Sequence, residues 1–315
     1  MEATAHPLDR PRTVAVRRPI FTHALPYLLI APTFFLVFIF TLWPAIRTVY
    51  DSFFIFFPGR NPRPPEFVGL QNYADLFDQS HPIVSDFVQI LTNTLIFTVG
   101  TVIFSIPIAL LLALLLNRRI RGLGIWRFAT FYPALLPAVG AASFWAFLYG
   151  NQLGLINTIL TSFGLQGQNW TGDPDLVLGA ITVQNIWKQA GYYMIFYLAG
   201  LQSIPRDIYE AADLDGAGYF QQLRYLTLPL LRRTTLFLLV VAFTFGFQTV
   251  EQLEALRGGL TNQRGNLLLY YIFQRRTDPR NWGYLNAMTV ILAGLVLIFT
   301  VANFVFFERR EDERG

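Results

Sequence analysis

The stretch SIPRDIYEAADLDGAGYFQQLRYLTLP, residues 203–229, has the pattern of two short helices joined by a tight turn. Ser203 and Pro205 favour the start of a helix, because serine caps a first turn and proline fits there without losing a hydrogen bond. Gly216 interrupts the pattern and favours a sharp turn. Residues 219–228 can then form a second helix. The stretch therefore predicts a helix, a glycine turn and another helix.

The composition around this stretch excludes a soluble or disordered chain. Of the 315 residues, 53% are hydrophobic and only 14% are charged, and the mean hydropathy is +0.41. Soluble domains carry roughly 25% charged residues. The chain has no cysteine and three histidines that are not at ligand spacing. We therefore expect a membrane protein with no metal site, no catalytic residues and no nucleic-acid partner.

Six apolar stretches are long enough to cross a bilayer, which takes about 20 residues in a helix. Their approximate bounds are Leu25–Tyr50, Phe87–Leu116, Ile125–Tyr149, Leu176–Leu201, Thr234–Val250 and Tyr284–Phe307. Prolines inside them, such as Pro133 and Pro137, predict kinks. The predicted fold class is an all-α membrane protein with six transmembrane helices.

Arginine placement sets the expected orientation. Arginines cluster before the first stretch and in alternate connections after it, and cytoplasmic loops attract arginine. The arginine-rich loop before the last stretch is an exception that six spans require. We expect a cytoplasmic tail (1–24), a six-helix domain (25–307) with a cytoplasmic loop (202–233), and a second cytoplasmic tail (308–315).

The cytoplasmic loop is too long and too patterned for a simple connection. Small alanines beside Gly216 leave a shallow surface, and Glu210 and Asp215 supply charges that orient a partner. The loop therefore predicts a docking element. From these residues alone, a helical hairpin that only caps the bundle remains an equal alternative.

Several motifs resemble those of one known family. The order Glu210-Ala-Ala, Asp215-Gly-Ala and Leu228-Pro229 resembles the EAA motif of ABC import permeases, and Phe67-Val-Gly-Leu-Gln-Asn-Tyr73 resembles their carbohydrate branch. The resemblance extends over about residues 26–306 and is strongest to sugar and glycerol-phosphate permeases of the maltose type that form the first subunit of a heterodimeric pair. It implies a type I importer fold whose loop docks on an ATPase. It implies this coupling role for Glu210, Ala211, Ala212, Asp215, Gly216 and Ala217.

The resemblance also implies partners and a location. They are a second homologous permease, a cytoplasmic ATPase dimer that binds ATP and Mg, an extracytoplasmic solute-binding protein, membrane lipid and a carbohydrate substrate. The expected location is the cell (inner) membrane of a bacterium or archaeon. The sequence has no GxxxxGK[ST] run, which agrees with a nucleotide site on another subunit. We expect no enzymatic activity in this chain.

Polar residues inside two predicted spans indicate a substrate pathway. Lys188 lies near the middle of the fourth stretch, where a charge costs about 2.5–3.5 kcal/mol on insertion scales. Amides, carboxylates and aromatic rings together suit a sugar. The predicted pathway residues are Gln184, Trp187, Lys188, Phe247, Gln248 and Glu251. Two alternatives remain open: a structural Lys188, and a solvated Glu251 paired with Arg257.

Two other functions are weaker on the same residues. A self-contained secondary transporter or channel needs acidic residues at the centre of a span or an inverted repeat, and the sequence shows neither. A membrane enzyme needs clustered histidine, aspartate or Ser–Lys machinery, which is also absent. The prediction is therefore half of a sugar pathway, driven by a separate ATPase.

Overall fold

The computed structural model describes residues 20–59, 62–118, 121–151, 154–256 and 265–312. The chain divides into two compact units, residues 1–48 and 49–315. The first unit contains α1 (Ile20–Val37), a π-helical turn η1 (Phe38–Leu42) and most of α2 (Trp43–Asp51). Residues 26–51 are long and apolar enough to cross a membrane, close to the first predicted span. The predicted tail of residues 1–24 lies outside the described residues up to position 19.

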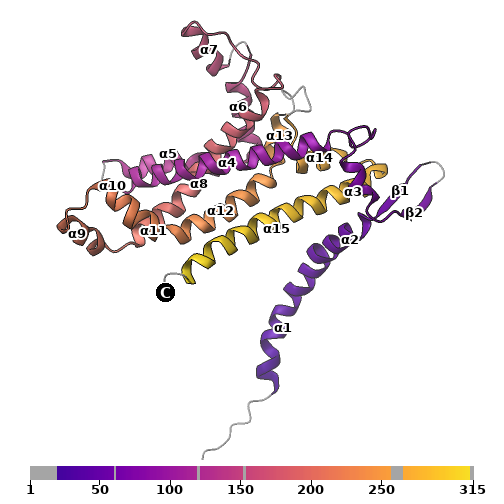
Figure 1. The fold of residues 1–315 in the computed structure, drawn as a ribbon, viewed down its shortest axis with the longest axis horizontal. Helices are drawn as coiled ribbons and strands as arrows, with labels where there is room; N and C mark the ends of the chain where they lie inside the picture. The colour runs from indigo at the N-terminus through magenta and orange to yellow at the C-terminus, as the bar shows by residue number, and fades with distance from the viewer. Residues whose placement is uncertain (1–19, 60–61, 119–120, 152–153, 257–264, 313–315) are drawn as a thin grey trace, which may run out of the picture. The chain divides into compact units, whose positions relative to one another are not determined.

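The second unit is a bundle in which α4, α8, α12 and α15 lie alongside one another (Figure 1). Its elements in chain order are β1 (Phe54–Phe57), β2 (Arg63–Phe67), α3 (Gln71–Leu76), α4 (Phe87–Leu116), α5 (Leu123–Leu135), α6 (Ala138–Leu148), α7 (Leu155–Ser162), α8 (Val177–Ser203), α9 (Arg206–Leu214), α10 (Tyr219–Gln222), η2 (Leu223–Thr227), α11 (Leu228–Leu230), α12 (Arg232–Phe247), α13 (Glu251–Leu256), α14 (Leu268–Arg275), η4 (Pro279–Asn281) and α15 (Trp282–Asp312).

Helices cover all six predicted spans, and the predicted all-α membrane fold is confirmed. Among the described residues, three helices pass a test of length and apolarity on their own, and two bent pairs raise the number to five. The remaining long helix, α8, has 27 residues, which at about 1.5 Å per residue is enough to cross. Its polar residues, discussed below, distinguish it from the other spans.

The third predicted span is broken rather than kinked. Between α5 and α6 the axis bends by 100°, and Leu136 is extended, with φ −67° and ψ 135°. Proline disfavours helical backbone in the residue before it and offers no N–H, so Pro137 explains the break. A similar bend of 65° precedes α12.

The two strands were not predicted. β1 and β2 form a small antiparallel pair in which Phe54 lies opposite Phe67. The backbone of β1 also contacts the start of α15 closely, because a Cβ on Gly283 would overlap the carbonyl oxygen of Phe54. This pair lies with α3 and α14 at the end of the bundle opposite α9 (Figure 1).

Close helix packing holds the centre of the bundle together. Buried residues of α4, α8 and α12 form one apolar cluster that includes Ala109, Tyr197 and Leu238. On α8, a Cβ at Gly191 would overlap the carbonyl oxygen of Thr130 on α5. The glycine therefore lets these two helices approach, and it fixes the side of α8 that faces α5.

Candidate functional site

The segment between α8 and α12 folds as the predicted helix–turn–helix, with different ends. Ser203 donates a 2.7 Å hydrogen bond to the carbonyl of Gly200, so it closes α8 instead of capping α9. Pro205 occupies the N-cap position of α9. The second helix does not stop before Pro229, because α10, η2 and α11 follow one another and α11 includes this proline. We call residues 203–230 the coupling segment, after the role that the sequence predicts for it.

Gly216 makes the turn of the coupling segment. Its φ is +78°, a left-handed value that side chains disfavour. The N–H of Ala217 donates to the carbonyl of Ala212 at 2.9 Å, and that of Gly216 to Asp213 at 3.1 Å. This is the Schellman pattern that ends a helix at a glycine. The left-handed backbone at residue 216 therefore explains why the turn has the glycine that the sequence analysis singled out.

Side-chain hydrogen bonds brace the two arms of the coupling segment. The Gln222 amide donates to Asp213 at 2.5 Å and to the carbonyl of Ala217 at 3.0 Å. Farther along, the hydroxyls of Tyr209 and Thr227 lie 3.0 Å apart. The segment therefore has a fixed shape supported by its own residues.

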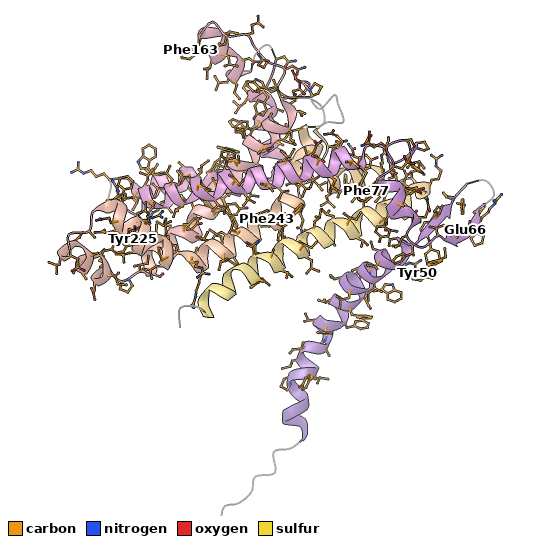
Figure 2. The ribbon with its side chains drawn as sticks, in the orientation of Figure 1. Tyr50, Glu66, Phe77, Phe163, Tyr225 and Phe243 are labelled. Carbon is orange, nitrogen blue, oxygen red and sulfur yellow. The ribbon has the colours of Figure 1, made fainter. Side chains whose placement is uncertain are left out.

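The outer surface of the coupling segment is exposed and partly apolar. Leu214, Phe220 and Tyr225 are 91%, 81% and 69% exposed; Tyr225 is labelled in Figure 2. Beside them lies a shallow hollow of about 390 Å³. It is lined by Ala212, Asp215, Gly216, Ala217, Gln221, Gln222, Tyr225 and Leu226. Four of the six predicted coupling residues line this hollow, while Glu210 and Ala211 are exposed on α9.

A second hollow, of about 510 Å³, lies between α8, the α5–α6 break and the end of α12. We call it the cavity. It is lined by Ala134, Ala138, Asn185, Lys188, Gln189, Tyr192, Phe245, Gln248, Thr249, Val250 and Gln252. Within the described chain, Lys188 is the only charged lining residue, and most others carry amides, hydroxyls or rings. These groups can donate and accept hydrogen bonds, a chemistry that suits hydroxyl-rich molecules.

Two of the predicted pathway residues, Lys188 and Gln248, line the cavity. Gln184 is fully buried beside it. Trp187 packs against Phe144 and Trp145, with ring centroids 5.9 and 5.7 Å away.

The other two predicted pathway residues lie elsewhere. Phe247 is buried in the bundle, 5.6 Å from the ring of Phe299. Glu251 begins α13, but its side chain lies outside the described part of the chain, as does its suggested partner Arg257.

The structure adds a group of hydrogen-bonded polar residues to the predicted pathway residues, and we call this group the relay. The Asn185 amide donates to Thr101 on α4 at 3.4 Å and accepts from Gln252 on α13 at 3.2 Å. Its neighbours on the cavity wall, Gln189 and Tyr192, follow Asn185 by four and seven residues. That spacing marks one face of a helix, so the sequence contained the signal for them. Gln252 lies beyond the end of α12 and gave no such signal.

The end of the bundle opposite the coupling segment carries charged groups at the start of the last span. Arg280 donates to the Asp278 carboxylate, with a shortest distance of 2.8 Å, and these hydrogen bonds lower the pKa of Asp278. Burial raises the pKa of the Tyr271 hydroxyl, which donates to the carbonyl of Ile83 at 3.4 Å. These contacts are consistent with a structural role.

A family model matches most of the chain. Residues 87–311 match the family described as "Binding-protein-dependent transport system inner membrane component". The chain is 31% identical over 305 residues to the arabinooligosaccharides transport system permease protein AraP of Bacillus subtilis (strain 168), covering 95% of this chain and 94% of that protein. It is 35% identical over 292 residues to the sn-glycerol-3-phosphate transport system permease protein UgpA of Agrobacterium fabrum, covering 91% and 95%.

Solved structures share the fold. A chain in the crystal structure of a bacterial alginate ABC transporter, in complex with an alginate pentasaccharide-bound periplasmic protein, aligns with a TM-score of 0.77. The sequences are 22% identical, and the alignment covers 92% of this chain and 97% of that one. A second alginate importer structure aligns with a TM-score of 0.73 at 23% identity, with coverage of 92% and 97%.

Proposed function

The chain belongs to the family of binding-protein-dependent transport system inner membrane components, and from this membership we propose how it moves its substrate. It is a permease subunit of an ABC importer, and the family transports solutes rather than catalysing a reaction. The alternative of a self-contained transporter or channel is not favoured.

The observation that carries the proposal is the coupling segment at one end of the bundle, away from the strand pair (Figure 1). Its arms are braced and its apolar side chains are exposed, which suits docking into a groove on a separate ATPase. Six residues make that contact: Ala212, Asp215, Gly216 and Ala217, which line the hollow, and Glu210 and Ala211, which are exposed on α9. The motion of the ATPase then reaches α8 and α12, which join this segment at its two ends.

The cavity is the part of the pathway that this chain contributes, and its substrate is a sugar or oligosaccharide. Amide side chains at Gln248 and Gln252 pair with hydroxyls, and the Tyr192 ring offers a stacking surface for a sugar ring. A relative's name specifies arabino-oligosaccharides, which supports this class. Gln184, Trp187, Phe247 and Glu251 complete the proposed pathway around Lys188.

The proposed assembly has two permeases, two ATPases and a binding protein outside the membrane. ATP and Mg bind to the ATPases, since this sequence has no glycine-rich phosphate loop. Closure of the ATPases moves the coupling segment and rocks the two bundles between inward-facing and outward-facing states. Arginines beside the coupling segment support cytoplasmic termini, with tails at residues 1–24 and 308–315 around the membrane domain.

Reconstitution tests this function. The chain is purified with its second permease and ATPase and placed in proteoliposomes with the arabinotriose-loaded binding protein. We expect ATP-dependent uptake of arabinotriose by the complex and none by this chain alone. Lys188→Met in the same complex should lower uptake and leave ATP hydrolysis intact. Uptake by the chain alone, without ATPase, would refute the proposed function.

If the complete complex takes up sn-glycerol 3-phosphate and excludes arabinotriose, the sugar assignment is wrong while the coupling role is unaffected. Competition between the two labelled compounds in one preparation measures this directly.

A further inference from the structure

The face of α8 next to the cavity is covered by α6. Ala180, Gln184 and Trp187 are four and three residues apart, so they lie along one stripe of α8. The two outer members of this stripe contact α6 and the residue after it: the Tyr149 hydroxyl donates to the carbonyl of Ala180 at 2.9 Å, and the Trp145 and Trp187 rings are 5.7 Å apart. Gln184 lies between these two residues on the stripe, and we infer that α6 covers it as well.

Where α6 packs on α8, each helix buries polar atoms that have no hydrogen-bond partner in the described chain. Gln184 is 0% exposed, and neither its amide nitrogen nor its amide oxygen has a hydrogen-bond partner in the described chain. From the α6 side, the indole nitrogen of Trp145 is likewise unpartnered, with the residue 9% exposed. Buried polar groups without partners are unfavourable and rare in native proteins. A leucine at position 184 would fill this contact without that cost.

The chemistry of these groups fits a neutral sugar. An amide offers a donor and an acceptor, the indole N–H offers a donor, and hydroxyl groups of a sugar match both. Trp145, Trp187 and Phe144 add aromatic rings, with the last two stacked at 5.9 Å. Such rings pack against the apolar face of a sugar ring, and this cluster contains no charged side chain.

α6, which covers the stripe, follows a break in the helix that separates it from α5. α6 follows the 100° bend after α5, and Figure 1 shows it leaving the line of the bundle near α13. Its first residue, Ala138, lines the cavity, and so does Lys188, one turn from Gln184. The cavity and the covered stripe are therefore neighbours, separated by the start of α6.

We propose that α6 covers a second sugar-binding surface, formed by Gln184, Trp145 and Trp187, which opens to the cavity in another state of the transport cycle. This inference rests on the proposed function. It predicts that the Gln184 amide, which has no hydrogen-bond partner in the present state, binds a sugar hydroxyl when α6 moves away. The unfavourable burial of the amide in the present state is then offset by a contact in another state.

Cysteine labelling tests the opening, because the chain has no cysteine of its own. Gln184→Cys in the complete importer is treated with 2-sulfonatoethyl methanethiosulfonate, first without nucleotide and then after trapping with ATP and vanadate. We expect little reaction in the first state, about tenfold faster reaction in the second, and protection by arabinotriose. Labelling is read from the mass of this subunit.

Tyr193→Cys is the matched control. Tyr193 lies on the same helix, is 0% exposed and also has a partnerless hydroxyl, but it is buried in the inner cluster with Met194 and Val102. It should stay unreactive in both states. If Gln184→Cys also stays unreactive, or if both variants react alike, the proposal is wrong.

Gln184→Leu separates a sugar contact from a structural role. We expect its melting temperature to equal or exceed that of the wild type, while arabinotriose uptake falls about tenfold through a raised KM. Wild-type uptake in this variant would refute the sugar contact. Failure of the wild-type complex to take up arabinotriose would instead refute the sugar assignment of the proposed function, so the two failures are distinguishable.

Discussion

The coupling segment, residues 203–230, and the cavity face of α8, residues 184–192, differ in how their polar groups are satisfied. In the coupling segment the bonds are local: Ala217 donates to Ala212, and Gln222 donates to Asp213. On the cavity face, Asn185 bonds to residues on α4 and α13. The first region therefore supports its own shape, whereas the second depends on how neighbouring helices are placed.

The exposed side chains show the complementary difference. Large apolar side chains such as Leu214 and Phe220 are exposed on the coupling segment, although burying them would be favourable. On the cavity face, the polar side chains of Gln184 and Asn185 are buried. Each region therefore carries side chains that suit a partner: a protein surface in one case and a hydroxyl-rich solute in the other.

The largest effect is expected from a substitution at the turn of the coupling segment. Gly216→Val places a β-branched residue at φ +78°, where strain costs about 1–2 kcal/mol and the turn must change. We expect ATP-driven uptake to fall about tenfold or more, with ATP hydrolysis continuing and the protein still in the membrane. Proteoliposome uptake and phosphate release measure the two activities.

Gly218→Ala is the control for that experiment. Gly218 has φ −68°, and a Cβ there would make only an ordinary contact with Gln221 at 3.9 Å. Uptake should stay near the wild-type value. Equal losses in the two variants would show that the left-handed turn is not what coupling requires.

The next effect breaks the cavity side. Asn185→Leu leaves the Gln252 amide and the Thr101 hydroxyl without their partner, and we expect a loss of about 1–3 kcal/mol of stability. The thermal unfolding of the purified complex measures it. Gln189→Leu on the same cavity wall, where no side-chain bond is broken in the described chain, should have little effect. If both variants unfold at the same temperature, the relay does not stabilise the bundle.

A smaller effect sharpens the coupling side. Asp213→Ala removes the brace to Gln222, an exposed hydrogen bond of about 0.5–1.5 kcal/mol, so uptake should fall about two- to threefold. Each of Asp213→Ala and Gln222→Ala already breaks this hydrogen bond, so the double variant should lose no further uptake through it. Fully additive losses would mean that the two residues act separately.

The smallest effect lies outside both regions. Asp278→Asn removes a carboxylate whose pKa is lowered by hydrogen bonds from Arg280 below its ordinary value of 3.8. A lowered pKa stabilises the fold above that value, and the benefit is lost as the pH falls through the folded pKa. Wild type should therefore melt slightly higher near neutral pH, with the difference vanishing in acid. A difference that grows in acid would contradict this sign.

The sequence predicted the coupling segment more completely than the cavity. The backbone shape of the coupling segment is set by Pro205, Gly216 and Ala217. Such local shape can be predicted from a few neighbouring residues. The cavity depends on contacts between distant helices. Lys188 could be predicted from the cost of a charge in a span and Gln248 from its aromatic and acidic neighbours, while Gln252 could not. The break at Pro137 was predicted only as a kink, because a proline shows where a helix is weak but not how far it bends.

The central claim is that the coupling segment is the surface through which a separate ATPase drives this bundle. A benzophenone cross-linker attached through Ala217→Cys in the assembled complex tests it most directly, with Phe77→Cys at the opposite end as the comparison (Figure 2). We predict that light captures the ATPase subunit from position 217 and not from position 77. Capture of the ATPase only from position 77, or from neither position in a complex that hydrolyses ATP, would contradict the claim.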